Sequence, residues 1–334
     1  MQMNTLDKSN MRQVILDSPL QMQEGLKLAK EVFVNGNFEN IIICGIGGSA
    51  WPADILGTIA SINIPVYMCR TYNLPAQVNA KSLVIGVSYS GNTEEPIATL
   101  KEALDKKLTI ICIASGGKIE SFCQENNLPF VKIPSGIQPR SATGYIFSAL
   151  AQILSNLKII PDLSDDILET SKKLETLNSS LEEAGKNLAK KLIKKIPVIY
   201  TSDTLKYLAM VWKIKFNENS KIPAFWNYFP ELNHNEMVGY TEFSKLGSEN
   251  FCLIILKDKT ENARILKRMD LTSEIIKNSG ANLEVIDMEE GSLLFKIFSS
   301  LLLGDWASYY LALENGIDPT PVKMVEDFKA SMER

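Results

Sequence analysis

Residues 82–93 read Ser-Leu-Val-Ile-Gly-Val-Ser-Tyr-Ser-Gly-Asn-Thr. The apolar run predicts a buried strand over Leu83–Val87, and a helical pattern starts directly afterwards at Glu94. The turn between them carries three hydroxyl side chains, on Ser88, Ser90 and Thr93. A helix N-terminus offers unpaired N–H groups and the positive end of the helix dipole, and hydroxyls add further donors. The stretch therefore predicts an anion site, and because the turn has no Lys or Arg it favours one phosphate over a polyphosphate.

A similar turn occurs earlier in the chain. The buried strand Ile41–Cys44 is followed by Gly-Ile-Gly-Gly-Ser at 45–49, where Gly48 and Ser49 are candidate phosphate contacts. Carboxyl ends of parallel strands meet at one edge of a sheet, so we expect the two turns to form one crevice. With Ala50 the first turn also fits G-x-G-x-x-A, a weak dinucleotide-binding pattern, and Arg70 would then suit NADP. That alternative stays open.

Short strands and helices alternate through the first half of the chain, which predicts an α/β fold with a doubly wound parallel sheet. The predicted strands are Ile41–Cys44, Pro65–Arg70, Leu83–Val87, Leu108–Ala114 and Phe130–Ile133. Helices are predicted over Leu16–Asn35, Ala53–Ser61, Glu94–Lys107 and Tyr145–Ser155, and another follows Ser115-Gly116-Gly117 and ends near Glu125. We expect a first domain over residues 1–158 that contains both turns.

The second half repeats the alternation more weakly, and we expect a charged helical connector over 159–195 and a second parallel domain over 196–334. Its predicted strands are Val198–Thr201, Phe251–Leu256 and Asn282–Ile286, and its predicted helices are Leu205–Asn217, Glu261–Asn278 and Ser292–Asn315. The segment Pro223–Gly247 fits neither helix nor strand. It is rich in aromatic and polar residues, which is typical of a loop near a site.

The composition is ordinary for a globular protein, with 45% hydrophobic and 22% charged residues among 334. The net charge of −4 gives no basis for a nucleic-acid surface. No apolar stretch approaches the roughly 20 residues of a membrane-spanning helix, and the polar start lacks a signal-peptide core. We therefore expect a cytoplasmic protein without a nucleic-acid or membrane partner.

Cysteine and histidine usage limits the chemistry further. The five cysteines lack C-x-x-C spacing and lie mostly in apolar runs, so we expect reduced core thiols, at Cys44, Cys69, Cys112, Cys123 and Cys252. The single histidine, His234, excludes metal sites that need two or three imidazoles. We expect no metal and no cofactor.

Two sets of motifs resemble a known family. Gly-Gly-Ser at 47–49 and Ser-Tyr-Ser-Gly-Asn-Thr at 88–93 resemble the sugar isomerase (SIS) domain. Asn-Glu-Asn-Ser-Lys at 217–221, Pro-Glu-Leu-Asn-His-Asn-Glu at 230–236 and the Gly-Asp-Trp block within 303–321 resemble the bifunctional phosphoglucose/phosphomannose isomerases. The resemblance covers nearly the whole chain. It implies two SIS-type domains and reversible conversion of glucose 6-phosphate and mannose 6-phosphate to fructose 6-phosphate through a cis-enediol.

The resemblance also implies roles for individual residues. Glu218 matches the family's base, and Arg140 matches an arginine that stabilises the enediolate. His234 matches the ring-opening residue, which in this family reaches the partner subunit's site and implies a homodimer. Of two candidates for the family's C-terminal lysine, Lys329 fits the terminal helical pattern better than Lys323. The phosphate is expected on Gly48, Ser49, Ser88, Ser90 and Thr93.

Three further expectations complete the interpretation. Glu218 should face the hydroxyl turns across a cleft, and Thr320 or a neighbouring small side chain should leave room near C1 and C2 of the sugar. Glu231 and Glu236 are competing carboxylates that we interpret as structural. The open functional alternatives are a non-catalytic sugar-phosphate sensor, which usually carries a basic helix-turn-helix that residues 1–40 cannot supply, and another SIS enzyme such as an aminosugar-phosphate isomerase.

Overall fold

The computed structural model describes residues 5–332. By its internal contacts the chain forms two compact units, which are described separately below. The N-terminal unit is Leu16–Glu175, and the C-terminal unit joins the residues up to Ile15 with those from Thr176 onward. The boundary falls inside α7 (Ser164–Lys191), a continuous helix of 28 residues.

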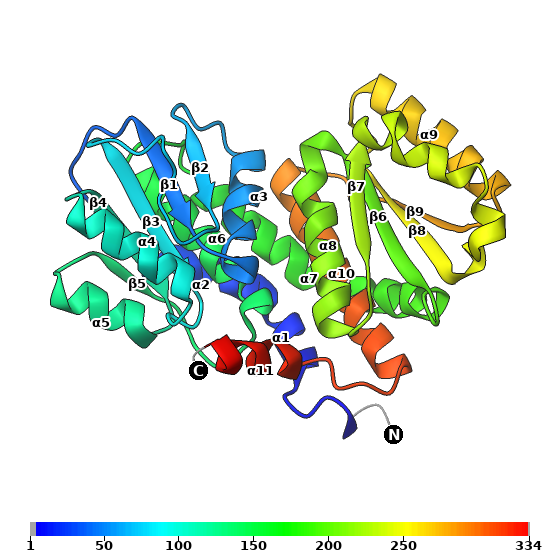
Figure 1. The fold of residues 1–334 in the computed structure, drawn as a ribbon, viewed down its shortest axis with the longest axis horizontal. Helices are drawn as coiled ribbons and strands as arrows, with labels where there is room; N and C mark the ends of the chain where they lie inside the picture. The colour runs from blue at the N-terminus through cyan, green and yellow to red at the C-terminus, as the bar shows by residue number, and fades with distance from the viewer. Residues whose placement is uncertain (1–4, 333–334) are drawn as a thin grey trace. The chain divides into compact units, whose positions relative to one another are not determined.

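The N-terminal unit is built on a parallel sheet of five strands in the order β2-β1-β3-β4-β5 (Figure 1). All five strands predicted for this half are present, and no bound differs by more than one residue: β1 (Asn40–Cys44), β2 (Val66–Cys69), β3 (Ser82–Ser88), β4 (Thr109–Ala114) and β5 (Phe130–Lys132). Strand order reverses on either side of β1, because β2 lies on one flank and β3 on the other. Ligands of open α/β sheets bind at the carboxyl ends of strands beside such a reversal.

Helices cover both faces of this sheet. Side chains alternate between the faces of a strand, and one set, which includes Ile42, Val84 and Cys112, packs with residues of α4 and α5. On the other side α6 packs against both α2 and α3. The helices of the unit are α2 (Ser18–Ala29), α3 (Trp51–Ile59), α4 (Glu94–Asp105), α5 (Gly117–Glu125) and α6 (Thr143–Asn156), preceded by α1 (Met11–Leu16).

The C-terminal unit holds a second parallel sheet, of four strands in the order β7-β6-β8-β9. Its strands are β6 (Ile196–Ser202), β7 (Phe225–Phe229), β8 (Phe251–Lys257) and β9 (Asn282–Asp287). Its helices are α8 (Lys206–Asn219), α9 (Ala263–Asn278), α10 (Leu293–Glu314) and α11 (Lys323–Met332). α8 packs on α10 and on β6 and β7, whereas α9 packs with the core residues of the opposite face, among them Tyr200 and Leu253.

One expectation for this unit was wrong. Residues 225–229, Phe-Trp-Asn-Tyr-Phe, form the edge strand β7, which pairs in parallel with β6 from Val198 to Ser202. Aromatic residues favour strands, but the central Asn227 interrupts the apolar pattern, so the stretch does not stand out as a strand in the sequence. Short 3-10 helices follow it: η5 (Glu231–His234), η6 (Glu236–Tyr240), η7 (Phe243–Leu246) and η8 (Ser248–Asn250).

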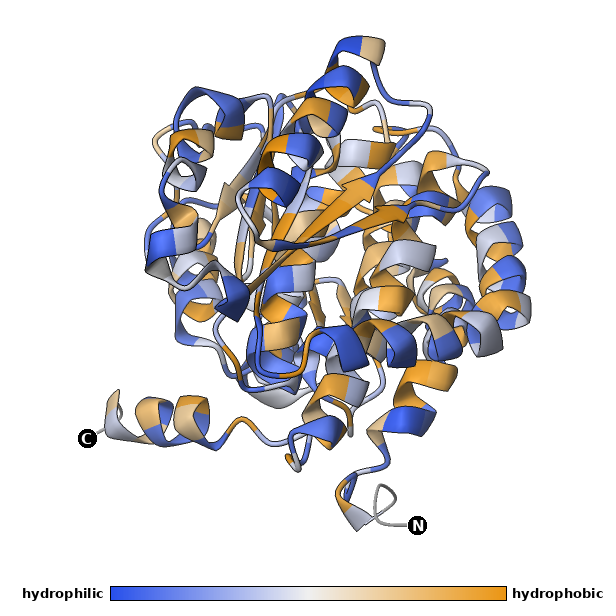
Figure 2. Ribbon diagram, turned by 90° about the vertical axis from the view of Figure 1, so that its right-hand side faces the viewer, coloured by the Kyte–Doolittle hydropathy of each residue, from blue (hydrophilic) through white to orange (hydrophobic). Residues whose placement is uncertain are grey.

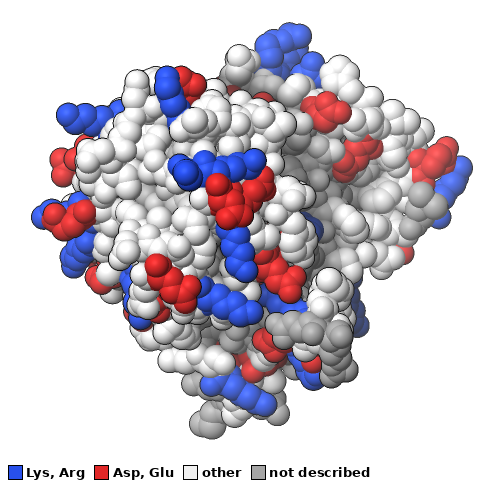
Figure 3. All heavy atoms as spheres, turned by 60° about the vertical axis from the view of Figure 1, so that its left-hand side comes forward, with Lys and Arg blue, Asp and Glu red and all other residues white. Residues whose placement is uncertain are grey.

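The distribution of polarity follows the layers. The strands are largely hydrophobic, as Figure 2 shows, and all five cysteines are buried free thiols, which confirms that prediction. On the face drawn in Figure 3, cationic and anionic side chains lie interspersed. Within residues 5–332 we find no helix with the length and apolar character needed to cross a bilayer.

Candidate functional site

The hydroxyl turn after β3 is a closed hydrogen-bonded structure. The Ser88 Oγ accepts the Gly91 N–H at 3.1 Å and lies 2.8 Å from the Thr93 Oγ1. Thr93 is the N-cap residue of α4, but its side chain makes no capping bond, because its hydroxyl is turned toward Ser88. Ser90 is exposed, and its Oγ accepts the Asn92 N–H at 3.2 Å. The structure therefore brings these three hydroxyls into one short turn at the start of a helix.

A neighbouring turn, after β4, holds this one in place. Gly91 has φ +68°, and a Cβ built on it would lie 1.7 Å from the carbonyl oxygen of Gly116. The Ile119 N–H donates to the Gly91 carbonyl at 3.0 Å, and the Lys118 N–H donates to the Asn92 Oδ1 at 3.1 Å. Only glycine fits this contact, since any side chain would collide with backbone in a conformation that L-residues disfavour.

The two predicted turns are joined directly. The Ser49 Oγ accepts the Tyr89 N–H at 2.9 Å, so the Gly45–Ser49 turn and the Ser88–Thr93 turn lie side by side at the carboxyl ends of β1 and β3. A serine hydroxyl that accepts a bond can still donate its own proton. Ser49 and Ser90 can therefore each offer a donor to an anion at the sheet edge, and Ser88 and Thr93, which share one hydrogen bond, can offer one more between them.

Arg140 comes to the same end of the N-terminal unit. It is buried in η3 (Pro139–Ser141), and its Nη1 donates to the Gln138 Oε1 at 3.3 Å. A Cβ built on Gly48 would lie 2.6 Å from the Pro139 carbonyl and 2.8 Å from the Arg140 amide nitrogen. The bare backbone of Gly48 thus lets η3, with its arginine, approach the first turn.

The residue that favoured a dinucleotide is engaged elsewhere. The Arg70 Nη2 donates to the Asp54 Oδ2 of α3 at 2.5 Å. Burial raises the pKa of the Asp54 carboxyl, although the bond from Arg70 acts in the opposite direction. The guanidinium of Arg70 is the counter-ion of a buried carboxylate, which accounts for its presence without a bound 2′-phosphate.

Glu218 lies in the last turn of α8, in the C-terminal unit, and the backbone around it is fixed from several directions. The Asn219 Nδ2 donates to the Ser308 Oγ of α10 at 2.9 Å, and the Ser220 Oγ donates to the Ser308 carbonyl at 2.6 Å. The Lys221 Nζ donates to the carbonyls of Glu218 and Pro319, at 2.5 and 2.8 Å. Glu218 therefore projects from a rigid helix end.

A buried ion pair anchors the preceding turn of α8. The Lys215 Nζ lies 2.5 Å from the Asp305 Oδ1, and the Lys215 side chain is only 2% exposed. Trp212 packs beside it, donating from its Nε1 to the Ser300 carbonyl at 3.0 Å and contacting Gly304. Gly304 and Asp305 of the Gly-Asp-Trp block thus fasten α10 to the helix that carries Glu218.

The segment with the single histidine is held by its neighbours, while His234 itself is exposed at the end of η5. The Asn233 Nδ2 donates to the Thr272 Oγ1 at 2.9 Å, and the Asn235 Nδ2 donates to the Glu231 Oε1 at 2.7 Å. Glu231 therefore supports the turn, as expected of a structural carboxylate. Glu236 belongs to a separate cluster, described below.

The two candidate lysines lie on α11, all of whose described side chains are at least partly exposed. Lys323 pairs with Asp327 one turn later, at 2.6 Å, and Lys329 is exposed. Thr320, just before this helix, donates its N–H to the Asp318 Oδ1 at 3.1 Å. The assignment of Lys329 as the active lysine remains a prediction.

Sequence reasoning missed the residues that hold the site together. Tyr89 joins both turns through its N–H, and its hydroxyl accepts the Ile137 N–H at 3.1 Å. In the sequence Lys221 stood out only as part of a motif. In the structure its φ is +56°, a conformation that residues other than glycine rarely adopt without stabilising contacts. Its three bonds to carbonyl oxygens supply those contacts.

The fold and the joined turns define a parallel α/β protein of the SIS class. The family described as "Bacterial phospho-glucose isomerase C-terminal SIS domain" matches residues 181–332. A solved structure of a Thermus thermophilus protein shares the fold, with a TM-score of 0.73 at 16% identity over 96% of this chain and 89% of that one.

The chain belongs to the family of bifunctional phosphoglucose/phosphomannose isomerases, and it is an isomerase. A member from Caldicellulosiruptor bescii is 40% identical over 94% of this chain and 96% of its own length. A protein of Sulfolobus acidocaldarius named D-glucosamine-6-phosphate 4-epimerase is also similar, at 32% identity over 86% of this chain and 87% of its own.

Proposed function

We propose that this enzyme interconverts glucose 6-phosphate, mannose 6-phosphate and fructose 6-phosphate through a cis-enediol, without a metal ion. The main support is the joined pair of hydroxyl turns, linked by the Ser49–Tyr89 hydrogen bond, in a chain 40% identical to a curated family member. Backbone N–H groups and hydroxyls at a helix start suit one phosphate group. We propose that Gly48, Ser49, Ser88, Ser90 and Thr93 bind the 6-phosphate.

The proposed chemistry is a proton transfer between neighbouring carbons. His234 opens the ring by passing the O1 proton to the ring oxygen, since imidazole exchanges protons near neutral pH. Glu218 then removes the C2 proton, and its acid form returns that proton to C1, while the O2 hydroxyl proton moves to O1 as the carbonyl relocates. The fixed charge of Arg140 stabilises the enediolate, and loss of such a group costs about 10²–10³ in rate. Lys329 assists near the ring oxygen.

The central test replaces the proposed base. Glu218→Gln should lower turnover by about 10²–10⁴ while fructose 6-phosphate still binds, because only the proton transfer is removed. Glu314→Gln, at the end of α10, is the matched control and should keep full activity. Loss of binding together with turnover would make Glu218 structural, and unimpaired turnover would exclude it as the base.

We further propose that the enzyme is a cytoplasmic homodimer in which His234 serves the partner subunit's site. Its exposure at the end of η5 supports this role. Mixing Glu218→Gln and His234→Ala chains tests it by complementation. If the two groups come from different subunits, each mixed dimer regains one intact site and activity returns. If they come from one subunit, both sites stay defective and the mixture remains inactive.

Substrate range and metal use need a side-by-side assay. Glucose 6-phosphate and mannose 6-phosphate should both be converted, and exhaustive treatment with EDTA should leave the rates unchanged. Glucosamine 6-phosphate belongs in the same assay because of the similarity to the Sulfolobus epimerase. Conversion of that sugar alone would replace the proposed reaction, and binding without any turnover would indicate a sensor.

A further inference from the structure

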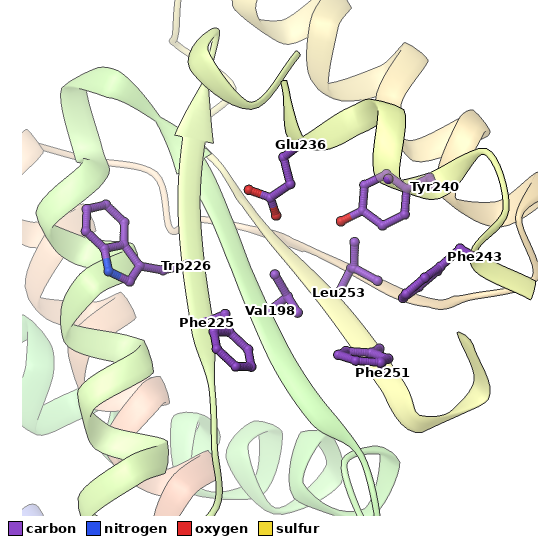
Figure 4. A pocket seen from close by; sticks show the side chains of 9 residues that line it. Val198, Phe225, Trp226, Glu236, Tyr240, Phe243, Phe251 and Leu253 are labelled. Carbon is purple, nitrogen blue, oxygen red and sulfur yellow. The ribbon is translucent and has the colours of Figure 1, made fainter. Parts of the chain in front are cut away.

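A pocket of about 400 Å³ opens on the sheet of the C-terminal unit (Figure 4). Its floor is Val198 of β6 and Leu253 of β8, and aromatic rings surround it, those of Phe225, Tyr240, Phe243 and Phe251. This face of the sheet packs with α9, whereas α8, which carries Glu218, packs on the other face. The pocket is therefore separate from the proposed base. Its volume is in the range of small-molecule sites.

One carboxylate points into this aromatic pocket. The Glu236 Oε2 accepts the Asn227 Nδ2 at 2.5 Å, and its Oε1 accepts the hydroxyl of Tyr200, which also contacts the hydroxyl of Tyr240. Burial raises the pKa of both tyrosines, so both hydroxyls keep their protons. Two side chains, from β6 and β7, thus hold the carboxylate in a fixed orientation, and Tyr240 of η6 contacts the first of them.

The carboxylate has no counter-ion of its own in the described part of the chain. Among residues 5–332, no Lys, Arg or His lies within ion-pair distance of Glu236, although nearby Glu242 pairs with Lys245. A fixed, partly buried anion among aromatic rings is the arrangement that recognises organic cations, because ring faces attract a cation and the carboxylate neutralises it.

We propose that this pocket is a binding site for an organic ammonium ion with an apolar body, such as an arylalkylamine. The ammonium group would meet the Glu236 carboxylate, and the apolar body would lie on Val198 and Leu253 among the rings. A neutral ligand of the same shape would leave the carboxylate without a partner, and an anion would be repelled. The exposed ring of Phe225, with 55% of its surface accessible, forms one wall at the opening.

Calorimetric titration of the full-length protein with 2-phenylethylammonium tests this site. We expect one ion per chain, and 2-phenylethanol, its neutral isostere, should bind at least about tenfold more weakly. Glu236→Gln should lower the affinity for the ammonium ion by at least about tenfold. Glu242→Gln, which changes another carboxylate of the same segment, should leave the affinity within about twofold of the wild type. Equal binding of the alcohol and the ammonium ion would overturn the proposal, as would undiminished binding to Glu236→Gln.

A second variant guards against a folding defect. Phe225→Ala removes an exposed ring, so it should lower the affinity for the ammonium ion without lowering the thermal unfolding midpoint. Analytical sedimentation of the same variants measures their oligomeric state and so tests the alternative that a second copy of the chain occupies the pocket. If Phe225→Ala or Glu236→Gln changes the oligomeric state and the wild type binds no ammonium ion, this face is a contact between copies and the ligand proposal is wrong.

Discussion

Substitution of Gly91 by alanine should disrupt the hydroxyl turn from within. A Cβ there would lie 1.7 Å from the Gly116 carbonyl oxygen, a backbone atom that cannot rotate away, so the two turns must separate by well over an ångström. The φ of +68° adds about 1–2 kcal/mol of strain for any L-residue. Separation also weakens the bond from the Ile119 N–H to Gly91, worth about 1 kcal/mol. We expect the free energy of unfolding to fall by about 3 kcal/mol.

Urea unfolding and hydrogen exchange would measure this effect at two levels. Exchange should accelerate across residues 88–119 in Gly91→Ala, and affinity for fructose 6-phosphate should drop. Gly57→Ala is the matched control, because Gly57 lies inside α3 with nothing within 4 Å of a built Cβ. That substitution should stabilise the protein by about 0.5–1 kcal/mol. A Gly91→Ala protein that matches the wild type in stability and exchange would refute the reasoning.

Three further predictions concern the buried ion pair of Lys296 with Asp258 and the bonds of Lys221 at the end of α8. Lys296→Met should lower the free energy of unfolding in urea by about 3–5 kcal/mol, because it leaves Asp258 buried without the ammonium group that lies 2.7 Å away. The double variant with Asp258→Leu should recover most of that free energy. A decrease of less than about 1 kcal/mol in Lys296→Met would contradict the idea. Burial raises the pKa of Asp258, but the bonds from Lys296 and Thr260 outweigh this effect and hold the pKa below its ordinary value. The stabilisation by this pair should therefore be complete above about pH 4 and decrease as the pH falls further. Acid unfolding of Lys296→Met should lack this pH-dependent part of the stability. Lys221→Gly suits the φ of 56° but removes the three bonds to carbonyl oxygens, so kcat should fall by about tenfold at unchanged KM as the end of α8 loosens; an unaltered kcat would show that Lys221 does not position Glu218.

Much of the fold was readable because its signals are local. Each strand of the N-terminal sheet is a short apolar run ended by a turn, and a buried parallel strand has no polar face to obscure it. The hydroxyl turns were also visible, since their residues are consecutive in the chain. β7 was not, because an edge strand with Asn227 at its centre depends on pairing with β6 for its identity.

The sequence by itself determined the parallel α/β architecture, the two turns at the sheet edge and the buried thiols. Only the tertiary structure decided that Ser49 binds the amide of Tyr89, that Gly91 touches Gly116, and that Lys221 joins the end of α8 to the Pro319 carbonyl. The physical reason is the distance along the chain over which each interaction acts. Strand and turn preferences act between near neighbours, whereas these contacts join segments far apart in the chain, and their partners become defined only when the sheets and helices pack.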